Sequence, residues 1–342
     1  MRALRFFEPG KVGVVDVPDP VAGPGEVVLK VHATGLCNSD IRVYLGEKKA
    51  AAGVIPGHEI SGEVVAAGDG ADRSLVGEVV GVCPILCCGR CSFCREGFRN
   101  RCPSRRTLGY DVDGGIAEYV RIPAPIVAMG QLLPMERSVP AHLRALLEPF
   151  SCVLNSIEEL ATAPGGSLAI VGGGPMGLLH LVAAKAYGAG PIMVVEPETE
   201  RRGVAMELGA DAAVTPEDAR AAGQELTRGE GFRSVAMAVG FAEAAPLALD
   251  LTRRLGRINL FAGFPPGSSH TFDLNRLHYD EVKVFGTQNA PFHLYAKAAR
   301  MIPRLPALAR VVTNRYTLED AAEAYAARLG KAGLKSAVVI EG

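Results

Sequence analysis

The sequence predicts an α/β protein made of a β-rich domain and a doubly wound domain with a parallel sheet. At about 150 residues per domain, a chain of 342 residues has room for roughly two domains. Short valine-rich runs alternate with Gly and Pro turns over residues 1–150, which is typical of β-structure. Beyond residue 164, strand-like and helix-like segments alternate, as in the βαβ units of a parallel sheet. We therefore expect a parallel-sheet domain at residues 153–291, inserted into a first domain formed by residues 1–152 and 292–342.

The elements of the first domain are expected in two stretches of the chain. Its early strands are expected at Val12–Val17, Val27–Val31 and Gly62–Ala66. After Pro291 the chain returns to this domain. The elements expected there are helices Leu294–Ile302 and Leu318–Leu329 and the strand Ser336–Ile340.

The second domain begins with the apolar run Ser167–Val171, then a glycine cluster, then a helical pattern from Met176 to Tyr187. Its further elements alternate between strand and helix. In order they are strand Ile192–Glu196, helix Thr199–Leu208, strands Ala212–Val214 and Val235–Val239, helix Glu243–Arg253 and strand Arg257–Phe261.

Composition and charge exclude several classes of protein. The chain has 48% hydrophobic and 21% charged residues, as ordinary globular proteins do. It carries 36 basic and 37 acidic residues without a long block of like charge, so no nucleic-acid or membrane-surface partner is expected. No apolar stretch approaches the ~18–20 residues of a membrane span, and the first residues lack the pattern of a signal peptide. We expect a cytoplasmic protein whose partners are small molecules.

Five of the eight cysteines lie within one short segment. Cys88, Cys91, Cys94 and Cys102 follow the spacing C-x2-C-x2-C-x7-C. Four thiolates on one loop can surround a tetrahedral Zn²⁺ with Zn–S distances of about 2.3 Å. Such a closed shell leaves no position for substrate, so the pattern predicts a structural zinc. Cys87 could replace Cys88, but the two x2 intervals favour Cys88.

A glycine-rich segment predicts a dinucleotide site. Gly172, Gly174 and Gly177 fit G-x-G-x-x-G between a strand-like run and a helical pattern, which is the required context. The first glycine permits a tight turn, the second lets the backbone approach a pyrophosphate, and the third permits close helix–strand packing. The helix that starts here, with Pro175 and Met176, then turns its N-terminus toward the phosphates.

The end of the next predicted strand favours NAD over NADP. Glu196 lies nineteen residues after Gly177, where a carboxylate can bind both adenosine ribose hydroxyls and repel a 2′-phosphate. Arg201 and Arg202 leave the NADP alternative open, because an arginine there can accommodate that phosphate. At the ends of later strands, Val239 and Gly263 are expected to contact the cofactor through their backbone; an ordinary turn is the alternative.

Other possible metal ligands are scattered along the first half of the chain. They are Cys37, the pair His58 and Glu59, and Glu148, each of which is a weak signal alone. Their order, combined with the other motifs, resembles the zinc-containing medium-chain dehydrogenase/reductase family, in its branch of polyol (sorbitol-like) and threonine dehydrogenases. The motifs that carry this resemblance are Cys37-x-Ser39-Asp40, Gly57-His58-Glu59, the four-cysteine loop, Asp113-Gly114-Gly115-x-Ala117-Glu118-Tyr119, Glu148-Pro149 and the glycine fingerprint.

The resemblance implies a fold and a cofactor set. It implies a GroES-like catalytic domain, a Rossmann NAD-binding domain, and a homodimer or homotetramer. It implies two zinc ions per chain, one catalytic and one structural, together with NAD. Arg201 matches the family arginine that lies along the adenine.

The resemblance also implies roles at the catalytic zinc. Cys37 and His58 resemble its direct ligands, and Glu59 resembles the acidic residue that binds the metal or gives way to water and substrate. Glu148 stands where polyol enzymes have Glu and alcohol dehydrogenases have Cys or His, and it binds zinc directly or through water. Asp40 resembles the carboxylate that orients the imidazole. Ser39 resembles the hydroxyl that binds the substrate oxygen and starts a proton relay.

One position departs from the family pattern. Many relatives have His five residues after the zinc-binding cysteine, where this chain has Arg42, so the proton relay must end differently. The activity implied is reversible oxidation of a secondary alcohol of a polyol, sugar or (amino)cyclitol to a ketone. The alternatives are an L-threonine 3-dehydrogenase, a zinc-independent quinone reductase-like enzyme, and a non-catalytic regulator that binds NAD and zinc.

Overall fold

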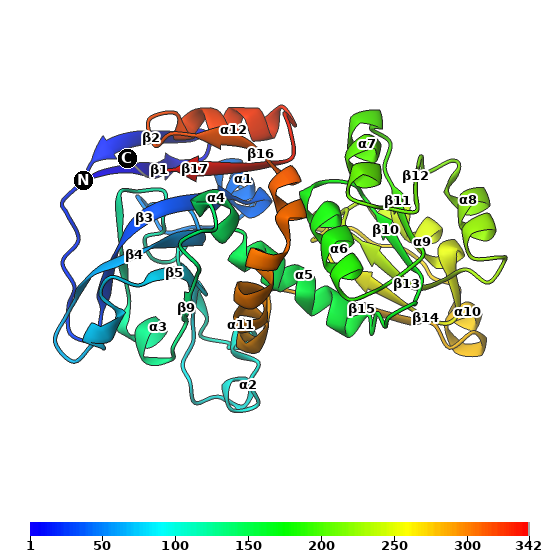
Figure 1. Ribbon diagram of the computed structural model, residues 1–342, viewed down its shortest axis with the longest axis horizontal. Helices are drawn as coiled ribbons and strands as arrows, with labels where there is room; N and C mark the ends of the chain where they lie inside the picture. Colours follow the sequence, from blue (N-terminus) through cyan, green and yellow to red (C-terminus); the bar gives the residue numbers. More distant parts are fainter. Residues whose placement is uncertain (341–342) are drawn as a thin grey trace. The chain divides into compact units, whose positions relative to one another are not determined.

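Two units make up the computed structural model, which describes residues 1–340 (Figure 1). One unit comprises residues 1–151 and 291–340, and the second comprises residues 152–290. The α/β class, with a β-rich unit and a parallel-sheet unit, is confirmed. Within residues 1–340, no helix has both the length and the apolarity needed to cross a membrane.

The first unit is built around a seven-stranded sheet. Its strands follow the order β16-β17-β3-β4-β5-β9, and β8 pairs with β3 outside this path. Two small two-stranded sheets, β1-β2 and β6-β7, complete the β-structure. The strands are β1 (Arg2–Glu8), β2 (Lys11–Asp16), β3 (Val27–Leu36), β4 (Glu59–Ala67), β5 (Val79–Val82), β6 (Ile85–Leu86), β7 (Arg106–Thr107), β8 (Tyr119–Ile122), β9 (Leu132–Pro134), β16 (Val312–Tyr316) and β17 (Lys335–Val339).

Alternating valines and leucines explain the central strands of this sheet. Val27, Leu29 and Val31 of β3 are fully buried and pack with Ile60 and Val64 of β4 in one core. Burial of such side chains contributes roughly 25 cal/mol per Å² of apolar area. The helices are α1 (Asn38–Tyr44), α2 (Ser92–Arg95), α3 (Ala124–Ala128), α4 (Ala141–Arg144), α11 (Phe292–Met301) and α12 (Ala321–Leu329); α5 (Leu147–Glu159) crosses the unit boundary.

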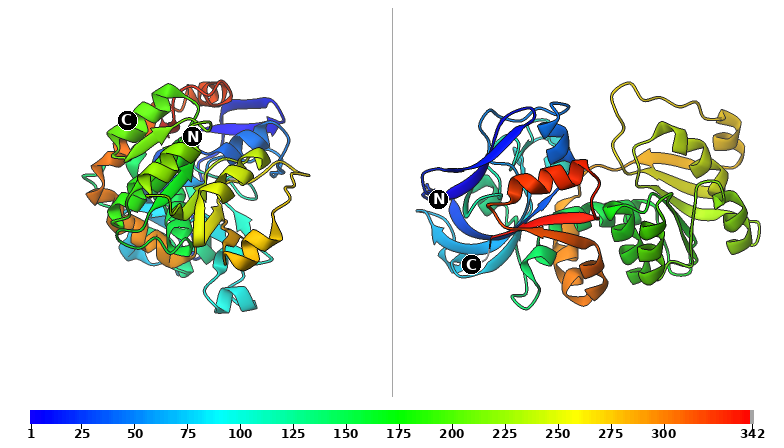
Figure 2. Two further views of the ribbon diagram at one scale, coloured as in Figure 1. Left: turned by 90° about the vertical axis from the view of Figure 1, so that its right-hand side faces the viewer. Right: turned by 90° about the horizontal axis from the view of Figure 1, so that it is seen from above.

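The end of the described chain returns to the start of this unit. β17 pairs antiparallel with β3, with Ser336 opposite Leu36, and parallel with β16. Figure 2 shows β17 and α12, in red, beside the blue N-terminal strands of the same unit. Residues near position 335 therefore lie next to the segment that follows β3.

The second unit is a six-stranded, wholly parallel sheet with the order β12-β11-β10-β13-β14-β15. The order reverses at β10, so helices cover both faces; Figure 1 shows α6 and α7 on one side and α8 and α9 on the other. The elements are β10 (Leu168–Val171), α6 (Pro175–Ala186), β11 (Ile192–Val195), α7 (Thr199–Glu207), β12 (Ala212–Val214), α8 (Ala219–Leu226), β13 (Phe232–Met237), α9 (Ala245–Leu251), β14 (Thr252–Leu260), α10 (Leu274–Tyr279) and β15 (Lys283–Gly286). Short 3-10 helices occupy Arg73–Leu75, Arg99–Arg101, Ala242–Ala244, Ile302–Arg304 and Pro306–Arg310.

The helix expected at Glu243–Arg253 is wrong at both ends. A 3-10 turn precedes α9, and α9 ends at Leu251. Thr252 adopts extended backbone and begins β14, while its hydroxyl donates to the Ala248 carbonyl. A β-branched residue that bonds back to the preceding turn favours this exit from the helix.

Three elements of the second unit, α8, α10 and β15, were not predicted from the sequence. Gly223 lies inside α8, and a Cβ there would press against Leu251 and Phe232 at 3.0 and 3.1 Å. The glycine therefore permits close packing of the helix but weakens its signal in the sequence. β15 is four residues long and pairs only with β14 at the edge of the sheet, so it lacks the apolar run of a central strand.

Candidate active site

Strand pairing brings the first group of possible metal ligands together. Cys37 is the residue between β3 and α1, and Glu59 is the first residue of β4, opposite Gly35 of β3. The ligand atoms of Cys37, His58 and Glu59 all lie within 4.8 Å of one another. Thiolate, imidazole and carboxylate are all ligands that zinc accepts, so this donor set fits a zinc ion.

Asp40 orients the His58 imidazole. His58 Nδ1 lies 3.3 Å from Asp40 Oδ1, and Asp40 Oδ2 accepts a 2.8 Å hydrogen bond from the Cys37 backbone N–H. Burial raises the pKa of Asp40, but the nearby His58 and Lys335 charges and the backbone hydrogen bond hold it below its ordinary value. Burial lowers the pKa of His58, but Asp40 and Cys37 raise it well above its ordinary value. Holding one ring nitrogen toward a carboxylate leaves the other for a metal.

Glu59 has one oxygen paired and one oxygen free. The Lys335 ammonium, from β17, donates to Glu59 Oε1 at 2.6 Å and to the Leu36 carbonyl at 3.0 Å. Glu59 Oε2 is buried without a hydrogen-bond partner among residues 1–340. A buried carboxylate oxygen without a partner is costly, and a metal ion beside it would satisfy it. Gly35 provides the space, because a Cβ there would overlap this oxygen.

Ser39 and Tyr110 extend the hydrogen-bond chain from the ligands. The Ser39 hydroxyl donates to Cys37 Sγ at 3.1 Å and lies 2.5 Å from the Tyr110 hydroxyl. The Tyr110 hydroxyl also lies 3.0 Å from His58 Nδ1. Burial, together with the charges of Asp40 and Cys37, raises the pKa of Tyr110 well above its ordinary value, so this hydroxyl keeps its proton. Arg42 is not part of this chain, because its guanidinium Nε pairs with Glu47 at 3.4 Å.

Glu148 is not a member of the ligand group. It is buried in the first turn of α5 and lies near enough to raise the pKa values of Tyr110 and Lys335. The atoms that meet within 4.8 Å nevertheless come from Cys37, His58 and Glu59. Its role as a zinc ligand stays a prediction.

Three residues of this site were not predicted from the sequence, namely Tyr110, Lys335 and Lys48, whose ammonium lies 3.4 Å from the centroid of the Tyr110 ring. Lys335 had a weak local signal, since it opens a strand whose last three residues are apolar. Tyr110 follows Gly109, whose φ of +82° marks a turn, but nothing in the residues around it indicates its contact with Ser39. Lys48 stands in a stretch with polar neighbours and has the pattern of a solvated loop.

The second group of possible ligands consists of four thiols. The sulfurs of Cys88, Cys91, Cys94 and Cys102 lie within 4.8 Å of one another, and α2 starts directly after Cys91. The Cys87 thiol lies outside this group, 3.4 Å from Met129 Sδ. Backbone N–H groups of Arg90 and Cys91 lower the pKa of Cys88 to about 6, which favours the thiolate that binds metal. This group also fits zinc.

The two remaining cysteines lie outside both groups. Burial raises the pKa of Cys83 to about 12, which is the behaviour of an unreactive core thiol. Cys152 lies in α5 and is partly exposed. None of the eight cysteines forms a disulfide bond.

The glycine fingerprint forms the turn between β10 and α6. Gly172 has a φ of +106°, and a Cβ there would overlap Val239. A Cβ on Gly177 would overlap the Gly172 carbonyl, so this glycine allows the helix to approach the strand. A Cβ on Gly174 meets no protein atom within 4 Å. Gly174 therefore leaves open space at the start of the helix, where α6 begins with Pro175 and exposes its unpaired N–H groups.

The strand ends beside this turn contribute backbone from two other loops. β10, β13 and β14 are in register, with Val171 opposite Met237 and Met237 opposite Leu260. Val239 follows β13 and lies against Gly172, while a Cβ on Gly240 would overlap the Gly263 carbonyl. These loops meet at the carboxyl end of the parallel strands, where such sheets bind dinucleotides.

Glu196 lies directly beside the glycine turn. It is buried, and its Oε2 accepts the Gly173 N–H at 2.7 Å while its Oε1 accepts the Glu198 N–H at 3.1 Å. Arg202 donates to the carbonyls of Glu196 and Pro197 at 2.9 and 2.6 Å. Arg201 pairs with Glu198 at 3.2 Å. The carboxylate is thus fixed in place, with two cations close by.

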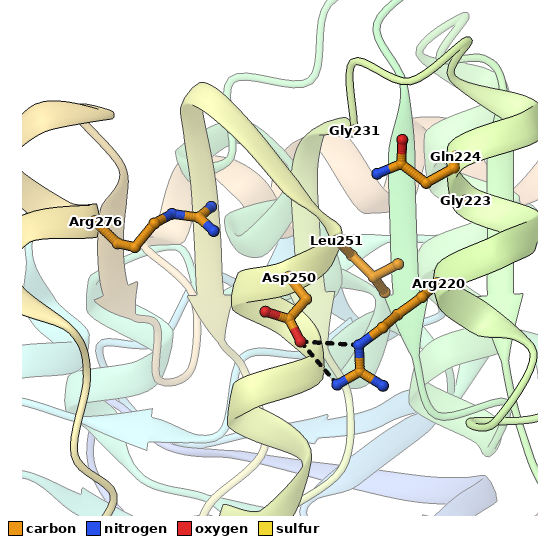
Figure 3. A pocket seen from close by; sticks show the side chains of 7 residues that line it. All are labelled: Arg220, Gly223, Gln224, Gly231, Asp250, Leu251 and Arg276. Atoms are coloured by element: carbon orange, nitrogen blue, oxygen red, sulfur yellow. Dashed lines mark hydrogen bonds and ion pairs between the residues drawn. The ribbon is translucent and has the colours of Figure 1, made fainter.

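A separate pocket of about 230 Å³ lies in the second unit, and none of the predicted site residues lines it (Figure 3). Arg220 crosses it to donate two hydrogen bonds, of 2.9 and 2.7 Å, to Asp250. Arg276 on the other wall pairs with Asp280 at 2.7 Å. Because both guanidinium groups already have carboxylate partners, the pocket offers no unpaired charge to a ligand.

Comparisons with known proteins identify the family. The family described as "Alcohol dehydrogenase GroES-like domain" matches residues 23–131, and "Zinc-binding dehydrogenase" matches residues 175–304. An L-threonine 3-dehydrogenase from Pyrococcus horikoshii is 36% identical over 288 residues, which cover 81% of this chain and 79% of that protein. A sorbitol dehydrogenase from Bacillus subtilis is 30% identical over 332 residues, 95% of this chain and 92% of that protein.

Among solved structures, a zinc-binding dehydrogenase from Sinorhizobium meliloti 1021 with bound NADP superimposes with a TM-score of 0.92. It is 28% identical, and the match covers 99% of this chain and 98% of that one. The predicted family membership is confirmed by these matches. The chain belongs to the zinc-containing medium-chain dehydrogenases/reductases, in the branch of polyol and threonine dehydrogenases, and is an NAD(P)-dependent alcohol dehydrogenase.

Proposed function

We propose that this enzyme oxidises a secondary alcohol of a polyol, sugar or (amino)cyclitol to the ketone, reversibly, with hydride transfer to NAD. The observation that carries the proposal is the meeting of Cys37, His58 and Glu59 within 4.8 Å, with the Ser39 hydroxyl on the Cys37 sulfur. Zinc bound by these residues supplies a Lewis acid that lowers the pKa of a substrate hydroxyl. A carboxylate rather than a second thiolate among the ligands suits a polar substrate with neighbouring hydroxyls. The proposed Glu148 ligand, direct or through water, adds a further oxygen.

The protein's own groups hold and move the proton in this proposal. Asp40 fixes the imidazole of His58 so that one nitrogen remains available to the metal. Ser39 Oγ accepts the proton of the substrate hydroxyl. Its next hydrogen-bond partner is the Tyr110 hydroxyl at 2.5 Å. Tyr110 would relay the proton by accepting one from Ser39 while releasing its own to water, in a chain that has Arg42 where relatives often have His.

NAD is the proposed cofactor, because Glu196 presents a buried carboxylate beside the glycine turn. A carboxylate there accepts hydrogen bonds from ribose hydroxyls and repels a 2′-phosphate. Gly172, Gly174, Gly177, Val239 and Gly263 are proposed to supply the backbone contacts, with Pro175 and Met176 at the helix start. Arg201 is proposed to lie along the adenine.

The test is a screen for NAD reduction, followed at 340 nm, across polyols, cyclitols, amino sugars and L-threonine. We expect turnover of polyols or cyclitols and its loss in Cys37→Ser, with Cys152→Ser as the matched control. Metal analysis should find about two zinc ions per chain in the wild type and one in Cys37→Ser, since the four-thiol group is untouched. Wild-type turnover by the Cys37→Ser enzyme would refute the site.

L-Threonine 3-dehydrogenase is the second candidate function, favoured by the 36% identity to the Pyrococcus horikoshii enzyme. Strong threonine turnover without polyol turnover in the same screen would establish it instead. The homodimer or homotetramer stays a prediction, which light scattering on the purified enzyme measures.

A further inference from the structure

Lys48 is a half-buried lysine beside the candidate active site. Its ammonium lies over the Tyr110 ring, 3.4 Å from the ring centroid, and the side chain is half-buried. Within residues 1–340, no acidic side chain forms an ion pair with it. Burial lowers the pKa of Lys48, the charges of Asp40 and Cys37 oppose this effect, and the charges of Arg105 and Arg42 lower the pKa further. A cation over an aromatic face gains some stabilisation, but a partly desolvated ammonium without an anion is unusual.

The position of this ammonium links it to the candidate active site. Tyr110, the ring beneath it, has its hydroxyl 2.5 Å from Ser39 Oγ and 3.0 Å from His58 Nδ1. Lys48 is therefore separated from the proposed proton acceptor by a single aromatic side chain. Both lie in the same unit, so this relation does not depend on the arrangement of the two units.

Two negative groups act on the charge of Lys48, and both have other partners. Asp40 and Cys37 are close enough to raise its pKa. Asp40, however, is engaged by His58 Nδ1 at 3.3 Å and by the Cys37 N–H at 2.8 Å. Cys37 is one of the three residues that would hold the metal. The positive charges of Arg105 and Arg42 also act on Lys48, so an additional anion beside its ammonium would be stabilised.

We propose that Lys48 binds an anionic group, a carboxylate or a phosphate monoester, on the alcohol substrate. This inference rests on the proposed function and narrows its substrate class from neutral polyols to alcohols that carry a negative charge near the reacting hydroxyl. An ammonium serves either anion as a compact point charge. The competing explanation is that Lys48 only offsets the negative charge of Cys37 and Asp40.

The test compares matched pairs of substrates that differ in this one charge. One pair is D-sorbitol and D-sorbitol 6-phosphate, and the other is L-threonine amide and L-threonine. For each pair, kcat/KM with NAD is measured in the wild type, Lys48→Met, Lys48→Arg and the control Lys49→Met, which removes a neighbouring exposed lysine. The two pairs separate a phosphate source from a carboxylate source.

We expect the wild type to prefer the charged member of one pair by at least tenfold. The preference should fall roughly tenfold to hundredfold in Lys48→Met, as for loss of a charge-assisted hydrogen bond. Lys48→Arg should recover part of it, and Lys49→Met should retain all of it. The inference is overturned if Lys48→Met and the wild type show the same preference for the charged substrate. It is also overturned if Lys48→Met lowers kcat/KM equally for charged and neutral substrates, which is the result expected if Lys48 only compensates charge.

A binding measurement separates failure of this inference from failure of the proposed function. Calorimetric titration with D-sorbitol 6-phosphate and L-threonine, with NADH present, reports binding without turnover. If the wild type oxidises no alcohol, the proposed function fails. Weaker binding of one anion to Lys48→Met than to Lys49→Met then still supports Lys48 as the anion site, and equal binding overturns it.

Discussion

His180 should make the folding stability of this enzyme sensitive to mild acid. The side chain is fully buried in α6, where Nδ1 donates to the Met176 carbonyl at 2.7 Å and the ring meets Phe261 edge-on at 4.6 Å. Nε2 is buried with no hydrogen-bond partner among residues 1–340. Burial lowers the pKa of His180 from 6.5 to about 4, against a smaller opposite effect of the Met176 hydrogen bond.

The sign and size of the effect follow from proton binding. Between pH 6.5 and 4, the unfolded chain binds a proton at His180 that the folded chain excludes, so the free energy of unfolding falls as the pH falls. Each pH unit in this window costs about 1.4 kcal/mol, so about 2 kcal/mol is lost between pH 6.5 and 5. No reduction for solvent screening applies, because the ring has no exposure.

The assay is urea unfolding at pH 7.5 and pH 5.0 for the wild type, His180→Asn and His270→Asn. Asparagine keeps a donor for the Met176 carbonyl but does not titrate, and His270 is exposed. Acid effects of other groups cancel in the difference between wild type and variant. On acidification, the free energy of unfolding of the wild type should fall by about 2 kcal/mol more than that of His180→Asn. The falls for the wild type and for His270→Asn should be equal. Equal losses for the wild type and His180→Asn would show that His180 does not cause the acid sensitivity.

Three further outcomes are expected. In zinc-free protein at pH 7, iodoacetamide should label Cys88 well before Cys94, because burial raises the pKa of Cys94. Labelling of Cys88 should slow below pH 6. Mass spectrometry measures both labelling rates, and equal rates would contradict a thiolate at Cys88. Glu196→Gln should lower the ratio of kcat/KM for NAD over NADP by roughly tenfold or more, and an unchanged ratio removes this carboxylate from the ribose site. Gly35→Ala should displace the Glu59 carboxylate, which should cost ~1–3 kcal/mol of stability and lower both the zinc content and the turnover. Wild-type stability, zinc content and turnover in this variant would show that Glu59 has room to move.

Much of this arrangement could be predicted because it is encoded locally. The fingerprint at Gly172–Gly177 combines a strand, a positive-φ turn and a helix start within a few residues. The four thiols likewise come from one short loop. Such features depend on neighbours along the chain, which a single sequence displays.

The parts that the sequence did not reveal depend on distant contacts. Tyr110 reaches Ser39 across 71 residues, and Lys335 reaches Glu59 across 276. Neither partner can be identified from its neighbours along the chain. The Lys335–Glu59 pair arises from the order of strands in the seven-stranded sheet, and the Tyr110–Ser39 contact joins a turn to the start of α1. The same holds for Gly223 in α8, whose role is visible only against Leu251 and Phe232.

The position of Lys335 has a consequence for how the enzyme matures. During synthesis, Cys37, His58 and Glu59 leave the ribosome long before the lysine that neutralises Glu59. The nascent first unit therefore holds a group of possible metal ligands with an uncompensated carboxylate until β17 enters the sheet between β16 and β3. Assembly of the candidate metal site is thereby tied to translation of β17, and a ribosome stalled before codon 335 carries a site that lacks this counter-charge.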